Sequence, residues 1–107
     1  MKEKIVVMIT TGSEEEAVKI SKALIEERLI ACANLIGQVR SLYKWKGVVC
    51  DDREVLMICK SQKHLFSQIA ARVKSLHSYE VPEIVALPVT EGWMPYLQWV
   101  EEETCKE

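Results

Sequence analysis

The longest regular pattern in the chain is a two-residue alternation that begins at Val39. One side of this alternation carries Val39, Ser41, Tyr43 and Trp45. Gly47 interrupts the pattern, which resumes over residues 54–60 with Val55, Met57 and Cys59 on one side. Alternation rich in aromatic and β-branched residues predicts strands with two different faces. Residues 39–60 are therefore predicted to form a β-hairpin that turns at Gly47.

This hairpin also predicts self-association. Each arm is longer than the usual strand of about 5–6 residues, so the tip should reach beyond a small domain. The aromatic side chains there would be exposed unless another chain covers them. We therefore expect an oligomer held together through residues 39–60.

The segment before the hairpin predicts one strand and one helix. The apolar run 5–9 predicts a strand covered on both faces, followed by a turn at 10–12. Residues 13–16 read Ser-Glu-Glu-Glu, a capping box in which Ser13 accepts from the Glu16 N–H and Glu16 reaches back. The helix is expected to run to about Arg28. Its predicted buried stripe consists of Ala17, Ile20, Leu24 and Ile25.

The segment after the hairpin predicts a helix, a strand and a last helix. Ser61 is the expected N-cap of the first of these helices. Its apolar stripe is Leu65, Phe66, Ile69, Ala70, Val73 and Leu76. A polar loop at 77–83 leads to a strand over 84–89, where Pro88 indicates an edge or a bulge. Pro95 fits the first turn of the last helix, whose apolar face carries Tyr96, Trp99 and Val100.

The order of these elements predicts the fold class. Strand, helix, strand, strand, helix and strand is the split βαβ order of ferredoxin-like folds, here with an extra C-terminal helix. The expected α+β fold is an antiparallel sheet with two helices on one face. We expect residues 1–107 to form a single domain, since 107 residues suffice for one core.

Composition narrows the class of protein. A net charge of −2, with acids and bases intermixed, disfavours a nucleic-acid partner. No apolar run approaches the ~20 residues of a membrane helix, and the N-terminus has no secretory pattern. The four cysteines form no C-x-x-C pair, which favours reduced thiols and a cytoplasmic location.

Several separated motifs occur together and in order. They are Ala31–Asn34, Ser41–Gly47, Glu54, Lys60, His77–Ile84 and Tyr96–Trp99. On these residues the chain resembles the CutA family of divalent-cation tolerance proteins over essentially its whole length. The resemblance implies a homotrimer similar to PII signalling proteins, with hairpins extending between subunits. It also implies a non-enzymatic role in tolerance of copper and other divalent metals, with no required cofactor.

If the chain binds copper or another divalent cation, the candidate ligands are His77, Glu80 and Cys32. Imidazole and thiolate suit copper. Some family members use a cysteine at the end of the first strand and two adjacent histidines, and the matching positions here hold Ile9, Leu76 and His77. Alternatively, His77 is a helix C-terminal residue and Cys32 is a small core residue.

The aromatic residues leave two interpretations open. They can pack between subunits, or they can line a small-molecule pocket in the intersubunit cleft. The candidate cleft residues are Tyr43, Trp45, Lys60, Tyr79, Glu83 and Trp99, with His77 and Glu80 as further polar groups. A PII-like effector-binding module is thus the main alternative function, and a passive assembly or anchoring protein is the third.

Catalysis is not expected. Glu80 and Glu83 would suit acid–base chemistry, but no nucleophile with an oriented base accompanies them. An ion pair with Lys or Arg across a subunit boundary is the favoured interpretation of both carboxylates. An acylphosphatase is disfavoured because the loop 10–12 contains no Arg to hold a phosphate.

Overall fold

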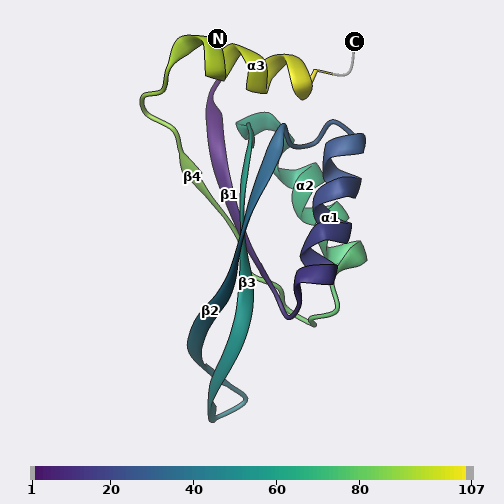
Figure 1. Cartoon of the computed structure of the whole chain (residues 1–107), viewed down its shortest axis with the longest axis vertical. Coiled ribbons are helices and arrows are strands. Elements are labelled where there is room, and N and C mark those ends of the chain that lie inside the picture. Colours follow the sequence, from purple (N-terminus) through teal and green to yellow (C-terminus); the bar gives the residue numbers. More distant parts are fainter. Residues whose placement is uncertain (1, 106–107) are drawn as a thin grey trace.

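The computed structural model describes residues 2–105, which form one four-stranded antiparallel sheet and three α-helices. The sheet order is β2-β3-β1-β4. The strands are β1 (Lys4–Thr11), β2 (Cys32–Trp45), β3 (Val48–Gln62) and β4 (Ile84–Pro88), and the helices are α1 (Glu14–Glu26), α2 (Phe66–Leu76) and α3 (Met94–Glu103). Helices α1 and α2 lie on one face of the sheet (Figure 1). The predicted ferredoxin-like fold is therefore confirmed.

The core lies between that face of the sheet and the two helices. Alternate residues of β1 and β3 point into it, so Val7, Ile9 and Met57 are fully buried. Helix α1 contributes Ala17, Ile20 and Leu24, and α2 contributes Ile69 and Val73. The prediction for Ile25 was wrong: this side chain is 42% exposed, because the stripe of α1 that contacts the sheet is narrower than the apolar pattern.

Strand β1 is longer than the apolar run that predicted it. Thr10 and Thr11 were expected in a turn, but they pair with Leu56 and Val55 of β3. The partner strand supplies the backbone hydrogen bonds, so the strand continues past the last apolar residue.

Helix α1 begins with half of the predicted capping box. Ser13 Oγ accepts from the Glu16 N–H at 3.1 Å, as expected. The Glu16 side chain does not return to Ser13; its Oε2 accepts from the Ser78 N–H at 2.7 Å. A tertiary contact has thus replaced the reciprocal bond of the local motif.

The predicted N-cap at Ser61 was wrong. Ser61 is a buried residue of β3, and its Oγ donates to the Leu29 carbonyl at 2.6 Å. The chain then passes through a 3₁₀ turn, Lys63–Leu65, before α2 begins without a side-chain cap. Ser61 pairs with Ile5, so the sheet has extended over the position where the local sequence favoured a helix start.

The hairpin is longer than the alternation indicated. Its arms, β2 and β3, contain 14 and 15 residues, and they project past the rest of the sheet (Figure 1). The turn at Gly47 is confirmed: Lys46 and Gly47 lie between the paired residues Trp45 and Val48, with φ of 50° and 81°. Two consecutive positive φ values match the type I′ turn that suits a twisted hairpin.

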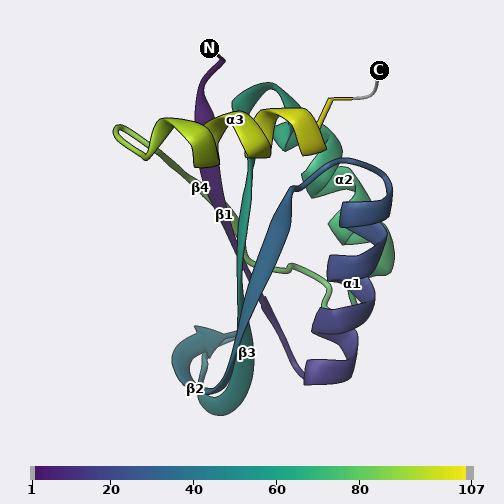
Figure 2. The ribbon, with the colours of Figure 1, turned by 45° about the horizontal axis from the view of Figure 1, so that its top comes forward.

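Strand β4 is an edge strand, one of the two alternatives that Pro88 indicated, because among the described strands it pairs with β1 alone. Helix α3 lies across the end of the sheet (Figure 2). Two polar contacts hold it there: Lys4 Nζ lies 2.7 Å from Glu101 Oε1, and Gln62 Nε2 donates to Thr104 Oγ1 at 2.8 Å. Of the predicted apolar face of α3, Val100 is buried, whereas Tyr96 and Trp99 remain partly exposed.

The face of the sheet opposite α1 and α2 is apolar and largely open. It carries the side chains that alternate with the core residues of each strand. They are Val6, Met8, Ile36, Leu56, Ile58, Val85 and Leu87. Within the described chain, only α3 covers part of this face, and Ile36, Val85 and Leu87 are each close to half exposed.

Candidate functional site

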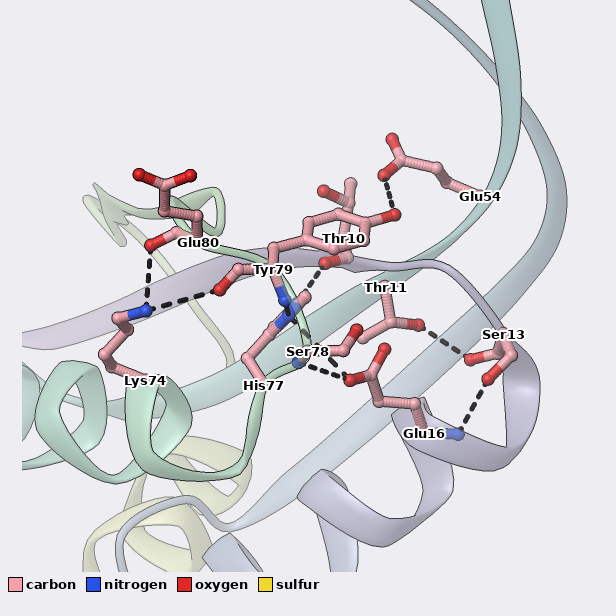
Figure 3. A network of polar contacts seen from close by, with 10 residues as sticks. All are labelled: Thr10, Thr11, Ser13, Glu16, Glu54, Lys74, His77, Ser78, Tyr79 and Glu80. Carbon is pink, nitrogen blue, oxygen red and sulfur yellow. Dashed lines mark hydrogen bonds and ion pairs between the residues drawn. The ribbon is translucent and has the colours of Figure 1, made fainter.

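A cleft of about 530 Å³ opens between the hairpin and the loop that follows α2. Its floor is the end of β1, and one wall is the part of β2 and β3 that begins to leave the sheet. The lining residues are Thr10, Ser41, Leu42, Tyr43, Trp45, Glu54, Tyr79, Glu80, Val81 and Glu83. Figure 3 shows the side of this cleft formed by the loop and β1.

His77 anchors the loop to the sheet. Its side chain is fully buried, and its Nε2 lies 2.7 Å from the carbonyl oxygen of Thr10, to which it donates. The other ring nitrogen, Nδ1, accepts from the Tyr79 N–H at 3.1 Å. Both nitrogens therefore bind backbone groups, and the imidazole joins the start of the loop to the end of β1 (Figure 3).

Glu16 and Lys74 hold the same loop from the helices. Glu16 Oε2 accepts from the Ser78 N–H and lies 3.9 Å from His77 Nδ1. Burial alone would raise the pKa of Glu16, but the hydrogen bonds from Ser78 and the nearby His77 outweigh it, and the pKa is lowered. Lys74 Nζ donates to the carbonyls of Tyr79 and Glu80, at 3.3 and 2.8 Å. The loop is thus fixed from three elements.

Tyr79 connects the loop to the hairpin. Its ring packs against His77, with centroids 4.6 Å apart, and its hydroxyl donates to Glu54 Oε2 at 2.7 Å. Burial, and then the bond to Glu54, raise the pKa of Tyr79, so the phenol stays a donor. Gly12 leaves room for this hydroxyl, because a Cβ at position 12 would lie 3.2 Å from it.

The opposite wall consists of aromatic residues of β2. Tyr43 donates a short hydrogen bond to Asp52, which raises the pKa of Tyr43 to about 12. The Lys46 ammonium lies over the ring of Trp45, 5.7 Å from its centroid. Both aromatic side chains remain about 40% exposed, so they offer surface to a bound molecule.

Four of the six predicted cleft residues lie together. Tyr43, Trp45, Tyr79 and Glu83 all line the cleft, and Glu80 joins them. Lys60 and Trp99 lie elsewhere. Lys60 Nζ contacts Asn34 and lies 3.9 Å from Cys32 Sγ, and the ring of Trp99 packs on Tyr96 of α3.

The three predicted metal ligands do not form a cluster. His77 is committed to backbone groups, Glu80 is exposed in the loop, and Cys32 begins β2, where its Sγ lies 3.4 Å from the Tyr96 hydroxyl. Residues 2–105 hold no group of three or more His, Cys, Asp or Glu side chains able to bind a metal ion. All four cysteines are free thiols, and burial raises the pKa of Cys59 to about 12. Within one described chain, therefore, these residues do not provide a complete copper site.

Three polar lining residues were not among the sequence candidates: Thr10, Ser41 and Glu54. Thr10 was assigned to a turn, and Glu54 was noted only as part of a family motif. The strand pairing places Thr10 and Glu54 at the cleft, because Thr10 pairs with Leu56, two residues beyond Glu54. The available signal in the sequence was a charged residue, Glu54, directly before an apolar strand segment. The structure buries this residue to 8% exposure, and a buried carboxylate requires a partner.

These features define an α+β protein of the ferredoxin-like class with an extended hairpin, an open apolar sheet face and a cleft beside the loop 77–83. The model of the family described as "CutA1 divalent ion tolerance protein" matches residues 5–103. The chain therefore belongs to this family. No helix among the described residues has the length and apolar character needed to cross a membrane.

Individual relatives support the same family assignment. The chain is 52% identical over 99 residues to the divalent-cation tolerance protein CutA of Thermus thermophilus, covering 92% of this chain and 96% of that protein. It is 48% identical to the human protein CutA over 90% of this chain, but spans 54% of the human protein's length. A solved Thermus thermophilus structure superposes with a TM-score of 0.93 at 50% identity, covering 95% of this chain and 99% of that one. The structure titled as a periplasmic divalent cation tolerance protein from Archaeoglobus fulgidus gives 0.92 at 35% identity, covering 94% and 98%.

Proposed function

We propose that the chain works as a homotrimer that contributes to divalent-metal tolerance without catalysing a reaction. Membership of the divalent ion tolerance family supports the metal part of this proposal. The open apolar sheet face supports the assembly part, and it is the observation on which the proposal mainly rests. The number of three subunits comes from the resemblance to the CutA family.

The assembly follows from surface that one chain leaves uncovered. The open face carries seven apolar side chains, and the hairpin adds Leu42, Val48 and Val49, which are 65%, 63% and 72% exposed. Large contiguous apolar surface on a soluble protein marks an interaction site. Burying it contributes about 25 cal/mol per Å² of apolar area, so further copies of the chain are favoured as its cover.

Light scattering coupled to size exclusion tests the assembly. We expect a mass three times that of the 12.3 kDa chain. Leu87→Lys, on the open face, should dissociate the assembly, whereas Ile25→Lys, a matched exposed aliphatic on α1, should not. A monodisperse wild-type monomer, or dissociation by both variants alike, would contradict the proposal.

We further propose that copper(II) is a cargo ion bound weakly at exposed groups, with Glu80 the accessible member of the sequence-predicted set. Neutral imidazole must offer a free nitrogen to bind metal, and both nitrogens of His77 are engaged. Ligands from a neighbouring subunit would have to complete the site. This part of the proposal rests on family membership and on the exposure of Glu80.

A copper(II) titration against a competing chelator, with the thiols blocked, tests the metal proposal. Binding should weaken in Glu80→Gln and remain unchanged in His77→Gln, in which the amide can still donate to Thr10. The reverse pattern would make His77 a ligand. Absence of copper binding by the wild type would remove metal binding from the proposal.

The non-enzymatic role and the location are proposals as well. The histidine beside the cleft has both ring nitrogens bonded to backbone, which leaves it unable to act as a base toward a hydroxyl. Free thiols favour a reducing compartment, and we propose the cytoplasm. Since one solved relative is titled periplasmic, fractionation of cells that produce the tagged protein is the test, and recovery outside the cytoplasm would contradict it.

The cleft favours a second candidate function, an effector-binding module. A cavity of about 530 Å³ lies in the size range of small-molecule sites. A ligand that binds only the folded protein raises its thermal midpoint. A midpoint that rises with small organic ligands but not with copper would favour this function, and the opposite response would favour metal handling.

A further inference from the structure

We propose that the cleft binds a small organic cation, an ammonium group carried on an apolar body. The inference names a ligand class for the cleft, so it rests on the second candidate function and on the cleft remaining open in the assembled protein. It does not depend on copper binding. Three features support it: the charge of the lining, the placement of the nearby cations and the aromatic wall.

The lining is negatively charged. Glu54, Glu80 and Glu83 all line the cleft, whereas no Lys, Arg or His among residues 2–105 does so. Glu54 is only 8% exposed, and within residues 2–105 its carboxylate receives one hydrogen bond, from the Tyr79 hydroxyl. Over the same residues, neither Glu80 nor Glu83 forms an ion pair. A cation that enters a cleft lined by three carboxylates is attracted to all of them, most strongly where the local dielectric is low.

None of the cations close in sequence to the lining residues lines the cleft itself: Arg40, Lys44, Lys46, Arg53 and Lys74. Lys44 and Arg53 alternate with the lining residues along β2 and β3, so their side chains leave the strands on the other face of the hairpin. Lys74 donates to two backbone carbonyls of the loop rather than to a carboxylate. Arg40 pairs with Asp51 on the other side of the hairpin, at 2.7 Å. Lys46 lies over the ring of Trp45 and is not among the lining residues. Among the described residues, therefore, no cation lines the cleft or forms an ion pair with its carboxylates.

The aromatic residues of the cleft would contact the ligand's cationic group and its apolar body. Tyr43 and Trp45 line one side of the cleft, and Tyr79 lines the other. The faces of such rings attract cations, and the Lys46 ammonium lies within reach of the Trp45 ring, 5.7 Å from its centroid. Rings and carboxylates together suit an ammonium group attached to an apolar body.

Other ligand classes fit less well. An anion would meet three carboxylates. A magnesium or calcium ion requires about six or more oxygen ligands around one point, and the described residues contain no such group. The cleft volume of about 530 Å³ also exceeds what a single ion needs. An organic cation satisfies the charge and fills the apolar surface.

A matched pair of probes tests the charge requirement. Benzylamine, protonated at neutral pH, and benzyl alcohol have nearly the same shape and differ by one positive charge. Both are titrated into the assembled, ¹⁵N-labelled full chain, and binding is followed at the backbone N–H of Tyr79 and the indole N–H of Trp45. We expect benzylamine to bind at least about tenfold more tightly, since removal of charge loses both the carboxylate and the ring contributions.

Two variants test the residues. Glu83→Gln should weaken benzylamine binding about threefold, as expected for one exposed charge pair. Trp45→Leu should weaken it by a similar factor through loss of the ring face. Glu91→Gln and Trp93→Leu remove the same groups from exposed positions beyond β4 and should leave the affinity unchanged. Light scattering on each sample verifies that assembly is the same.

Several results would overturn the inference. One is equal binding of benzyl alcohol and benzylamine, and another is unchanged affinity in both Glu83→Gln and Trp45→Leu. Saturation by magnesium chloride at the same concentration, with the same resonances shifted, would reduce the site to non-selective charge and also overturn it. Binding of benzoate in place of benzylamine would keep an effector-binding cleft but reject the cation. Failure of the inference is thus distinguishable from failure of the second candidate function.

Discussion

Replacement of His77 separates a structural role of the imidazole from a metal-binding role. In His77→Ala, the Thr10 carbonyl loses its donor and the Tyr79 N–H loses its acceptor. Each buried polar group left without a partner costs about 1–3 kcal/mol. Two such groups give a range of about 2–6 kcal/mol, and water entering the space will recover part of it. We expect His77→Ala to lower the free energy of unfolding by about 3 kcal/mol.

Two further variants measure separately how much stability the hydrogen bond at each ring nitrogen of His77 contributes. In His77→Gln, the amide nitrogen can take the place of Nε2 and donate to Thr10. In His77→Asn, the amide oxygen can take the place of Nδ1 and accept from Tyr79. Each should restore about half of the loss, about 1.5 kcal/mol, because each keeps one of the two hydrogen bonds.

Equilibrium unfolding in guanidinium chloride, at one fixed chain concentration, measures these changes, since assembly is linked to stability. His64→Ala is the matched control. His64 is exposed in the 3₁₀ turn, and its replacement should change stability by less than about 0.5 kcal/mol. A loss within about 0.5 kcal/mol in His77→Ala, or Asn and Gln variants as unstable as Ala, would refute this account of the loop.

Three other predictions concern the turn, the cleft and acid stability. Gly47→Ala should destabilise the chain by about 1 kcal/mol in thermal unfolding, because φ at this position is 81° and only glycine adopts it without strain; no loss would contradict the type I′ turn. Tyr79→Phe should cost about 1.5–3 kcal/mol through loss of the bond to Glu54, and unchanged stability would contradict that bond. The folded-state pKa of Glu16 is lowered, so its stabilisation is present above the unfolded pKa of about 4.3 and is lost as pH falls through the folded pKa. Glu16→Gln should therefore flatten the acid side of the stability curve, measured by denaturant unfolding from pH 3 to 7, whereas Glu15→Gln should not.

Local chemistry explains where sequence interpretation was right. The Ser13 cap and the turn at Gly47 depend on neighbouring residues, and both were confirmed. The element order followed from hydrophobic periodicity, which depends on the face that each segment buries. These features could be predicted because their causes lie within a few residues along the chain.

The wrong predictions share a different cause. Ser61 has the side chain of a helix cap, but pairing with Ile5 draws it into β3. Thr10 and Thr11 resemble a turn, yet β3 extends them as strand. Glu16 has the sequence of a capping box, but the Ser78 N–H takes its carboxylate. In each case a partner distant in sequence offers a hydrogen bond that the local motif would otherwise have formed.

The amino-acid sequence was sufficient to predict the fold class, the hairpin and its turn, and five of the residues that line the cleft. The contacts that the functional side chains form could be seen only in the folded chain. In the folded chain both ring nitrogens of His77 form hydrogen bonds with backbone groups. Cys32 and Lys60 lie together away from the loop 77–83, and the Glu54 carboxylate accepts from the Tyr79 hydroxyl. This division arises because periodicity fixes only which side of an element a residue occupies. The register between strands and the docking of a loop fix which residue lies opposite, and these depend on the packing of the whole chain.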